Sequence, residues 1–366
     1  MFSVSSMRIT RIYLLFTVTS LLAIGIVMIF SASSIYSLTM KNDSAFFLKR
    51  QVFFLFIGLI MAAASMSFDY RLLSRYSKQL IILSFVLLIL VLLPGIGREV
   101  SGAKRWFRFG FFSFQPSEFV YLAIIIYTAD FLSRKANAIE NFFHGFLPPV
   151  LVTGFIVGLI LLQPDLGTSI AILSIVILLM FIGGIKIKYI MQGAILGAPF
   201  LYFLIFSVPY RRARILSFLN PWADPRGSGF QIIQSQIALG SGGIFGKGLG
   251  KGIQKLLYLP AAHTDFIFSI IGEELGLIGT LGLICLFVIL LILGIKIAKE
   301  AKDQFGFFLA LGLVLMIVLK AVVNIGVSIG MFPTKGLPLP FISYGGSSLV
   351  FDMIAVGLLL NIAKRA

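Results

Sequence analysis

The sequence has very few of the side chains from which disulfide frameworks and metal centres are built. Among its 366 residues there is one cysteine, Cys285, and there are two histidines, His144 and His263. A disulfide needs two cysteines, and a structural zinc site usually takes four Cys or His ligands. A disulfide scaffold, an iron–sulfur cluster and a Cys/His zinc site are therefore excluded.

Charged side chains are also scarce. Only 12% of the residues are Asp, Glu, Lys or Arg, whereas 59% are hydrophobic, and the mean hydropathy is +1.04. Soluble domains are about half apolar and a quarter charged. A single soluble core of this length would leave many apolar side chains in contact with water, so lipid must be the solvent for most of them. The composition predicts an all-α, polytopic integral membrane protein.

Apolar stretches that approach the roughly 17 to 25 residues of a membrane-spanning helix occur ten times along the chain. They are Ile12–Phe30, Val52–Phe68, Leu80–Ile96, Phe119–Leu132, Phe146–Leu162, Ile170–Ile185, Tyr189–Val208, Phe266–Ile297, Phe305–Met331 and Leu349–Ala363. The stretch 266–297 would be about 48 Å long as a helix, so we expect it to tilt or to project from the bilayer. Residues 1–366 are therefore expected to form one membrane domain with about ten transmembrane helices.

The first apolar stretch follows Arg8 and Arg11, as in a secretory signal peptide. Its apolar core of 19 residues is longer than that of a signal peptide and favours a retained helix.

Basic residues outnumber acidic ones by 30 to 14. With a cytoplasmic N-terminus, ten spans would place 14 of the basic residues inside and 15 outside. Short loops set topology, and omitting the seven basic residues of the long segment 207–265 leaves 14 against 8, which favours this orientation. The remaining outer charge is concentrated in 98–108 and 211–255, where insertion rules do not require it. Such a placement suggests an anionic ligand on the outer side.

The first of these basic segments interleaves cations with aromatic rings. It contains Lys104, Arg105, Trp106 and Arg108, and Glu118 follows at the next membrane entry. An arginine fork can bind a phosphate, while the rings pack at a membrane interface. The alternative is an interfacial anchor in which Glu118 only pairs with Arg105.

The long segment 207–265 between the seventh and eighth spans is rich in turn-forming residues, and loops of this length are usually functional. Seven glycines lie in the segment from Gly240 to Gly252, together with Lys247 and Lys251, and Lys255 follows. Consecutive backbone amides can form an anion-binding nest to which lysines add charge. The lysine pattern is not a Walker A motif, because Lys247 precedes a glycine rather than Ser or Thr. A flexible re-entrant loop is the alternative.

A carboxylate, Asp265, stands immediately before the long eighth span. Aspartate is a common helix N-cap, and that interpretation requires no catalytic role. A helix continued from Asp265 would place Ser269, Gly272 and Gly276 on nearly the same face. This stripe of small residues suits either close helix packing or a groove for a lipid chain.

Several other polar residues fall in or near apolar stretches, where ionisable groups are costly and often functional. They are Asp165, Glu273, Glu274, Lys320, Asn324 and Asp352. Each could belong to a site or form an interhelical pair.

Six motifs, taken together and in order, resemble those of the SEDS family of polytopic cell-wall proteins. They are AKRW at 103–106, QPSE at 115–118, QPDLGTS at 163–169, NPWADPRGSGFQ at 220–231, HTDFIFSIIGEELG at 263–276 and PTKGLPLPFISYGGSS at 333–348. The resemblance extends over essentially the whole chain. Lys335 in the last motif is similar to the division branch rather than the elongation branch.

The resemblance implies a ten-helix inner-membrane glycosyltransferase that polymerises lipid II into peptidoglycan strands on the outer face of the membrane. The family's essential aspartate falls on Asp265, and its outer Arg-Trp pair falls on Arg105 and Trp106. Supporting positions fall on Glu118, Asp165, Glu273 and Lys335. One departure is Ala261, where the family often has glutamate, so a second carboxylate role is absent at that position.

The implied reaction suits these residue types. The attacking sugar hydroxyl needs a base and the departing pyrophosphate needs positive charge. Our hypothesis is that Asp265 is the general base and that Arg105, Lys104 and either Lys247 or Arg211 bind the pyrophosphate. A pyrophosphate can also be held by a divalent cation, Mg or Mn, and Asp265 could instead ligate such an ion.

A lipid II flippase is the alternative from another class. It would need a polar path through the bundle, which Glu273, Glu274, Lys320, Asn324 and Asp352 could form. The concentration of charge on the outer side favours the enzyme. A scaffold that only recruits a partner would give no reason for the acid at position 265.

The resemblance also implies partners and a location. The expected ligands are lipid II and the lipid-linked nascent glycan, and the expected protein partners are a class B penicillin-binding protein and other divisome proteins. No nucleic-acid partner is expected. The protein is expected in the bacterial cytoplasmic membrane, with both termini cytoplasmic, at the division septum.

Overall fold

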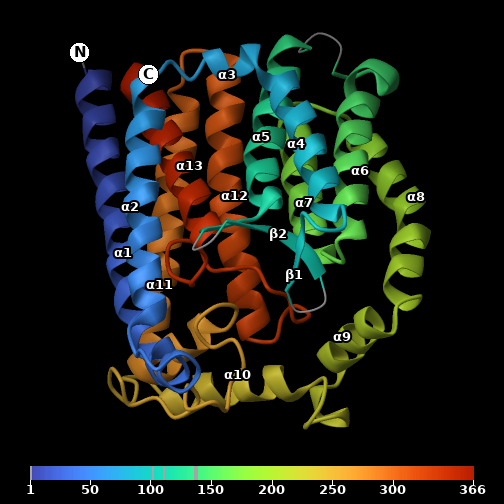
Figure 1. Cartoon of the computed structure of the whole chain (residues 1–366). Helices are drawn as coiled ribbons and strands as arrows, with labels where there is room; N and C mark the ends of the chain where they lie inside the picture. Colours follow the sequence, from blue (N-terminus) through green and yellow to red (C-terminus); the bar gives the residue numbers. More distant parts are fainter. Residues whose placement is uncertain (1, 101–102, 110–111, 136–138) are drawn as a thin grey trace.

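A computed structural model describes residues 2–100, 103–109, 112–135 and 139–366. Within these described residues, ten long helices form a bundle in which both ends of the chain lie at the same end of the bundle (Figure 1). The helices are α1 (Phe2–Lys41), α2 (Phe46–Ser67), α4 (Ser77–Leu92), α5 (Pro116–Arg134), α6 (Leu147–Leu162), α7 (Leu166–Ile182), α8 (Ile187–Phe206), α11 (Ile267–Lys299), α12 (Gln304–Ser328) and α13 (Gly346–Arg365). Each coincides with one of the ten apolar stretches, so the predicted helical membrane fold is confirmed.

Seven of these ten helices are long and apolar enough to cross a membrane by themselves. The other three are α4 and α7, which have 16 and 17 residues, and α5, which carries Glu118, Asp130 and Arg134. Packing in the bundle compensates for the polar groups of α5, because most of its residues are buried. The chain is an integral membrane protein.

Short elements form the end of the bundle opposite the termini, which we call the far end (Figure 1). In the segment 207–265, α9 (Pro209–Leu219) and α10 (Phe230–Gly242) lie across this end. A short helix, α3 (Leu72–Arg75), lies at the end that carries the termini.

A small antiparallel sheet, which the sequence did not predict, follows α4. Its strands are β1 (Arg98–Val100), β2 (Ala103–Phe109) and β3 (Phe112–Phe114), in the order β1-β2-β3. The strand β2 contains the cations and aromatic rings of the first basic segment, and the ring of Phe107 stacks on that of Phe114 at 6.3 Å. The sheet holds these cations in fixed positions at the entry to α5.

The helix α11 consists of two helical segments that meet at Gly276, whose φ of 68° interrupts the helical backbone. Glycine adopts a positive φ without the steric cost that a side chain would bring. The excess length of the stretch 266–297 is therefore accommodated by a bend, and the first segment belongs to the far end.

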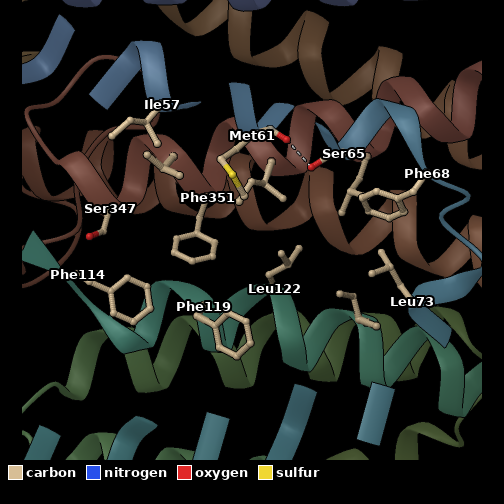
Figure 2. A pocket seen from close by; sticks show the side chains of 14 residues that line it. Ile57, Met61, Ser65, Phe68, Leu73, Phe114, Phe119, Leu122, Ser347 and Phe351 are labelled. Carbon is tan, nitrogen blue, oxygen red and sulfur yellow. Dashed lines mark hydrogen bonds between the residues drawn. The ribbon is translucent and has the colours of Figure 1, made fainter. Parts of the chain in front are cut away.

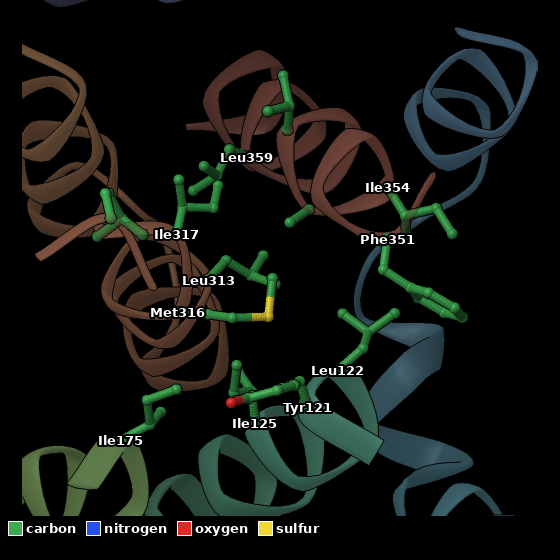
Figure 3. Close-up of a cluster of buried hydrophobic side chains, with 14 of the residues drawn as sticks. Tyr121, Leu122, Ile125, Ile175, Leu313, Met316, Ile317, Phe351, Ile354 and Leu359 are labelled. Atoms are coloured by element: carbon green, nitrogen blue, oxygen red, sulfur yellow. The ribbon is translucent and has the colours of Figure 1, made fainter. Parts of the chain in front are cut away.

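The core lies where α5, α7, α12 and α13 meet (Figure 3). Side chains from all four helices interdigitate there, and α13 is the most enclosed, with almost all its residues buried. At the other extreme, α8 has no buried residue and stands at the edge of the bundle (Figure 1). This central packing fixes the helices from which the polar groups described below project.

Candidate active site

Asp265 lies in a tight turn just before α11. The carbonyl of Ala261, a residue with φ of 56°, accepts hydrogen bonds from the amides of Thr264 and Asp265 at 3.1 Å and of Phe266 at 3.4 Å. The N-cap of α11 is Phe266, and no side chain caps the helix. The N-cap interpretation of Asp265 is therefore wrong, and its carboxylate is left for another role.

Three consecutive carbonyl groups of this turn are held from outside it. The amide of Tyr344 donates to the carbonyl of His263 at 3.0 Å, and the Ser343 hydroxyl donates to that of Thr264. The amide Nδ2 of Asn324, from α12, donates to the carbonyl of Asp265 at 2.9 Å and to that of Leu337 at 2.7 Å.

The backbone around Asp265 is thus fixed between α12 and the loop 333–345. In the part of the chain that the structure describes, no group donates a hydrogen bond to the carboxylate itself.

Burial raises the pKa of Asp265 from 3.8 to about 6, and the positive charge of Arg214 opposes this shift. The loop approaches the carboxylate at Gly336, where a Cβ atom would stand 3.0 Å from Oδ2 of Asp265. Arg214 comes from α9, donates to the carbonyl of Thr334 at 3.0 Å and lies 4.4 Å from the ring of Tyr210. The guanidinium of Arg214 is therefore held in place near the carboxylate of Asp265.

Lys335 connects this loop to the start of α7. Its side chain lies directly over Gly167, since a Cβ atom there would be 1.3 Å from Cε of the lysine. Burial lowers the pKa of Lys335 to about 7, an effect that Arg105 adds to and Asp165 opposes. A lysine with this pKa can gain a full positive charge when an anion binds beside it.

Arg105 projects from β2 onto the turn between α6 and α7. Its Nε donates to the carbonyl of Gln163 at 2.8 Å, another nitrogen donates to that of Pro164, and Nη1 lies 3.7 Å from Oδ2 of Asp165. Asp165 in turn caps α7 by accepting from the amide of Thr168 at 3.1 Å. The sheet, the α6–α7 turn and Lys335 therefore meet at one place.

The neighbours of Arg105 on β2 differ in exposure. Lys104 is exposed and Trp106 is half-buried, opposite Arg98 in the register of β1 and β2.

Two of the predicted pyrophosphate ligands are engaged elsewhere. The Arg211 guanidinium donates to the carbonyls of Leu204 at 3.0 Å and Leu161 at 3.5 Å, which ties α9 to the ends of α8 and α6. The ammonium of Lys247 pairs with Glu273 at 2.8 Å. Arg214, which sequence reasoning missed, is the cation that approaches Asp265. Its spacing of three residues from Arg211 in a helix was the available signal.

The glycine-rich loop is held by buried carboxylates of the chain itself. Glu273 accepts from the amides of Ile253 at 2.9 Å and Gln254 at 3.1 Å. Glu274 accepts from the amide of Gly250 at 3.0 Å and from the ammonium of Lys255 at 2.6 Å. The amides that we expected to form a nest for a substrate anion are thus satisfied internally.

The stripe of small residues on α11 serves helix packing. The hydroxyls of Ser269 and Ser235 lie 2.6 Å apart, and a Cβ atom at Gly272 would be 2.4 Å from Leu239. Both partners belong to α10, so the lipid-groove interpretation of this stripe is wrong.

A second polar cluster lies deeper, one helical turn along α12 from Asn324. The ammonium of Lys320 pairs with Glu118 at 2.6 Å and with Asp352 at 3.1 Å, and it lies 4.9 Å from the ring of Tyr121. The interhelical pairing of Lys320 and Asp352 is confirmed. The alternative in which Glu118 pairs with Arg105 is wrong.

An apolar groove of about 450 Å³ runs between α2, α5 and α13 (Figure 2). It begins beside the sheet, at Phe114 of β3 and at Ser347, and extends toward α3, to Phe68 and Leu73. Its lining includes Met61, Phe119, Leu122, Val350, Phe351 and Ile354. The groove therefore leads from the cation-bearing sheet along the membrane-spanning part of the bundle.

The described residues contain no group of three or more His, Cys, Asp or Glu side chains that could hold a metal ion. Protein ligands alone therefore do not form a closed metal site in this part of the chain.

The chain matches known proteins over almost its whole length. Residues 12–366 match a family model described as a cell cycle protein and named for FtsW, RodA and SpoVE. The chain is 48% identical to a probable peptidoglycan glycosyltransferase FtsW of Trichlorobacter lovleyi, over 96% of this chain and 92% of that protein. It is 46% identical to the stage V sporulation protein E of Bacillus subtilis, over 94% and 93%.

Solved structures agree with these matches. A chain from a peptidoglycan synthase complex superposes with a TM-score of 0.79 at 33% identity, over 96% of this chain and 97% of that chain. The rod shape determining protein RodA of Thermus thermophilus superposes with a TM-score of 0.71 at 30% identity, over 96% of each chain.

Proposed function

The chain belongs to the FtsW, RodA and SpoVE family of cell-cycle proteins, and from this membership we propose that it is a peptidoglycan glycosyltransferase that polymerises lipid II. Its relatives include proteins named FtsW and a sporulation protein, and a structural neighbour is a peptidoglycan synthase complex. The names of these relatives support the division branch rather than the elongation branch, as Lys335 does.

One observation carries the catalytic assignment. The backbone of the turn that carries Asp265 is fixed by hydrogen bonds to three of its carbonyl groups. The carboxylate oxygens of Asp265, by contrast, accept no hydrogen bond from the described residues. A group held in this way can accept a proton from a substrate hydroxyl without first breaking a protein contact. Three cations lie near Asp265 or near the loop 333–345 that approaches it: Arg214, Lys335 and Arg105.

The reaction transfers a glycosyl group from a pyrophosphate to a sugar hydroxyl. The hydroxyl oxygen forms a bond to the anomeric carbon, the bond from that carbon to the pyrophosphate oxygen breaks, and the hydroxyl proton passes to Asp265. Arg105, Lys335 and Arg214 stabilise the charge that develops on the departing pyrophosphate. The exposed Lys104, next to Arg105 on β2, adds to this positive charge.

A divalent cation, Mg or Mn, would be held by Asp265 together with phosphate oxygens of the substrate, because Mg²⁺ binds through one or two carboxylates plus phosphates. It would supply charge stabilisation of the leaving group.

The apolar groove supports a lipid-linked substrate. It begins beside the sheet that carries Lys104 and Arg105 and is lined almost entirely by apolar side chains (Figure 2). An isoprenoid chain in the groove would place its pyrophosphate next to the cations of β2.

Filling the groove should weaken substrate binding without changing the chemical step. Replacing Ile354 with Trp places a bulky ring in the middle of the groove lining. We expect KM for lipid II to rise about tenfold while kcat changes less than twofold, because binding that is equal in the ground and transition states affects KM alone. The control is Ile289→Trp on the exposed face of α11. Equal KM values for the two variants would contradict a lipid chain in this groove.

The polymerase and flippase proposals are distinguished by one pair of assays. Purified protein with its cognate class B penicillin-binding protein is incubated with labelled lipid II, and the same protein in liposomes is tested for lipid II translocation. We expect glycan strands in the first assay. Translocation without polymerisation would instead favour a flippase. The ionisable groups proposed for a polar path support the enzyme, since the buried side chains of Glu273, Glu274 and Lys320 are each already in an ion pair with another side chain of the protein.

We further propose that a class B penicillin-binding protein is the partner, since the structural neighbour is part of a peptidoglycan synthase complex. Other divisome proteins and a septal location are proposed from the division branch. A cytoplasmic position for both termini is proposed from the charge distribution, and it would place Asp265 and the sheet toward the outer face.

A further inference from the structure

A turn at the far end presents large apolar side chains away from the protein. Ile244 is 60% exposed and Phe245 is 80% exposed. They stand between Gly243 and Gly246, whose φ angles are 58° and 80°. We call residues 243–246 the apolar turn. A contiguous exposed apolar surface marks a site of interaction with a protein or a membrane.

The apolar turn is rigidly attached to the bend of α11. The amides of Leu277 and Ile278 donate to the carbonyls of Gly243 and Ile244 at 2.9 and 3.2 Å. On the other side, the amide of Lys247 donates to the carbonyl of Glu273 at 3.0 Å.

Glycines make this close attachment feasible. A Cβ atom at Gly276 would be 2.3 Å from the Gly246 amide, and one at Gly246 would be 2.2 Å from the carbonyl of Glu274. The turn is therefore a fixed projection rather than a mobile loop.

The exposed side chains of the turn continue a surface of α11 that faces lipid. Leu277, Ile278 and Leu281 are 52, 56 and 50% exposed, and they begin the apolar, membrane-crossing part of this helix. Because the turn is bonded to Leu277 and Ile278, its own side chains lie at the end of the same surface.

Further exposed apolar residues follow the turn in the loop, and a cation stands among them. Leu249, Ile253 and Tyr258 are 56, 50 and 54% exposed. Lys251 is exposed and has no ion pair in the described part of the chain. Long basic side chains beside apolar ones are typical of elements that lie at the boundary between acyl chains and headgroups.

We propose that the apolar turn inserts into the bilayer leaflet at the far end and anchors the glycine-rich loop to it, with Lys251 at the level of anionic headgroups. The occupant of this surface is phospholipid rather than a protein, because the surface continues the lipid-facing side of α11. This proposal is independent of the catalytic assignment.

The test uses full-length protein in proteoliposomes of phosphatidylethanolamine and phosphatidylglycerol, with a nitroxide attached to one cysteine at a time. The native Cys285 is exposed on α11 and serves as the lipid reference. In a Cys285→Ser background, Phe245→Cys reports on the turn and Arg226→Cys, at an exposed polar site, serves as the water reference. Accessibility to oxygen and to a water-soluble nickel chelate is then measured.

We expect the ratio of oxygen to nickel accessibility at position 245 to exceed that at 226 at least fivefold and to approach that at 285. A ratio at 245 equal to that at 226 would overturn the proposal and would leave the surface free for a protein partner. Leu249→Cys, measured in the same way, gives an independent second position. Neither substitution removes a core contact, because both side chains are more than half exposed.

Discussion

Replacing Asp265 with Asn is expected to lower the rate of lipid II polymerisation by roughly 10²- to 10⁴-fold, the usual contribution of a positioned general base. Asparagine has nearly the same shape, so the bonds that Asn324, Ser343 and Tyr344 make to the backbone of the turn are retained. The loss would therefore report on the carboxylate itself. The measurement is the single-turnover rate of strand elongation with saturating lipid II.

The matched control is Glu300→Gln, because Glu300 is an exposed carboxylate at the C-terminal end of α11, whereas Asp265 precedes the start of that helix, and Glu300 forms no ion pair in the described residues. Its rate should stay within twofold of wild type. Equal rates for the two variants would remove Asp265 from both the base and the metal-ligand roles.

The pH dependence of the polymerisation rate should follow the ionisation of Asp265. Because burial raises the pKa of Asp265 to about 6, wild type is expected to lose activity about tenfold per pH unit below that value. Above pH 7 the carboxylate is ionised and this dependence should disappear. A flat profile between pH 5 and about 7 would contradict the general-base role.

The raised pKa of Asp265 also affects stability, and in the opposite direction: ionisation of the carboxyl increases activity but lowers the stability of the fold. A carboxyl whose pKa is raised from 3.8 to about 6 on folding favours the protonated form, so its contribution to stability is lost as the pH rises through that interval. Asp265→Asn should therefore be more stable than wild type at pH 8, by at most about 3 kcal/mol. A variant that is inactive yet more stable cannot owe its inactivity to unfolding.

The fold could be predicted largely from hydropathy. Each of the ten apolar stretches became a helix, because in lipid every backbone polar group must be satisfied within a segment. The bend at Gly276 and the sheet of β1 to β3 could not be predicted in this way. Both depend on contacts between segments, such as the Gly246 backbone against Gly276, rather than on local periodicity.

The site could be predicted in its residue types but not in its pairings. Asp265, Arg105 and Lys335 came from motifs, and the structure brings the cations to the same loop region. Sequence reasoning selected Arg211 and missed Arg214, because one-dimensional charge counting cannot tell which face of α9 meets the loop 333–345.

For Asn324 the sequence leaves open a role in a site and an interhelical pair. Its role in holding the backbone of Asp265 depends on a long-range contact that no short motif records.

The buried cluster around Lys320 should be the most sensitive point for stability. Lys320 is fully buried and is the cation that pairs with Glu118 and Asp352, which are also buried. Lys320→Met would leave two carboxylates without a counter-charge inside the bundle. We expect a loss of about 3–5 kcal/mol in the free energy of unfolding, the usual cost of breaking a buried pair. The measurement is unfolding in mixed detergent micelles.

If Lys320 stabilises the fold by its charge, removing the two carboxylates as well should restore stability. If it acts through its packing, no such recovery is expected. The triple variant Lys320→Met, Glu118→Gln, Asp352→Asn removes all three charges together, so most of the lost stability should return. Lys302→Met, at an exposed position between α11 and α12, should change stability by less than about 0.5 kcal/mol.

If the triple variant were as unstable as Lys320→Met, the lysine would be acting through its shape. A rescued triple variant would separate stability from activity, because Asn324 lies one helical turn along α12 from Lys320 and keeps its hydrogen bond to the carbonyl of Asp265. Full polymerisation by that variant would assign the cluster to folding alone, whereas a stable but slow variant would place its charge in the electrostatics of the site.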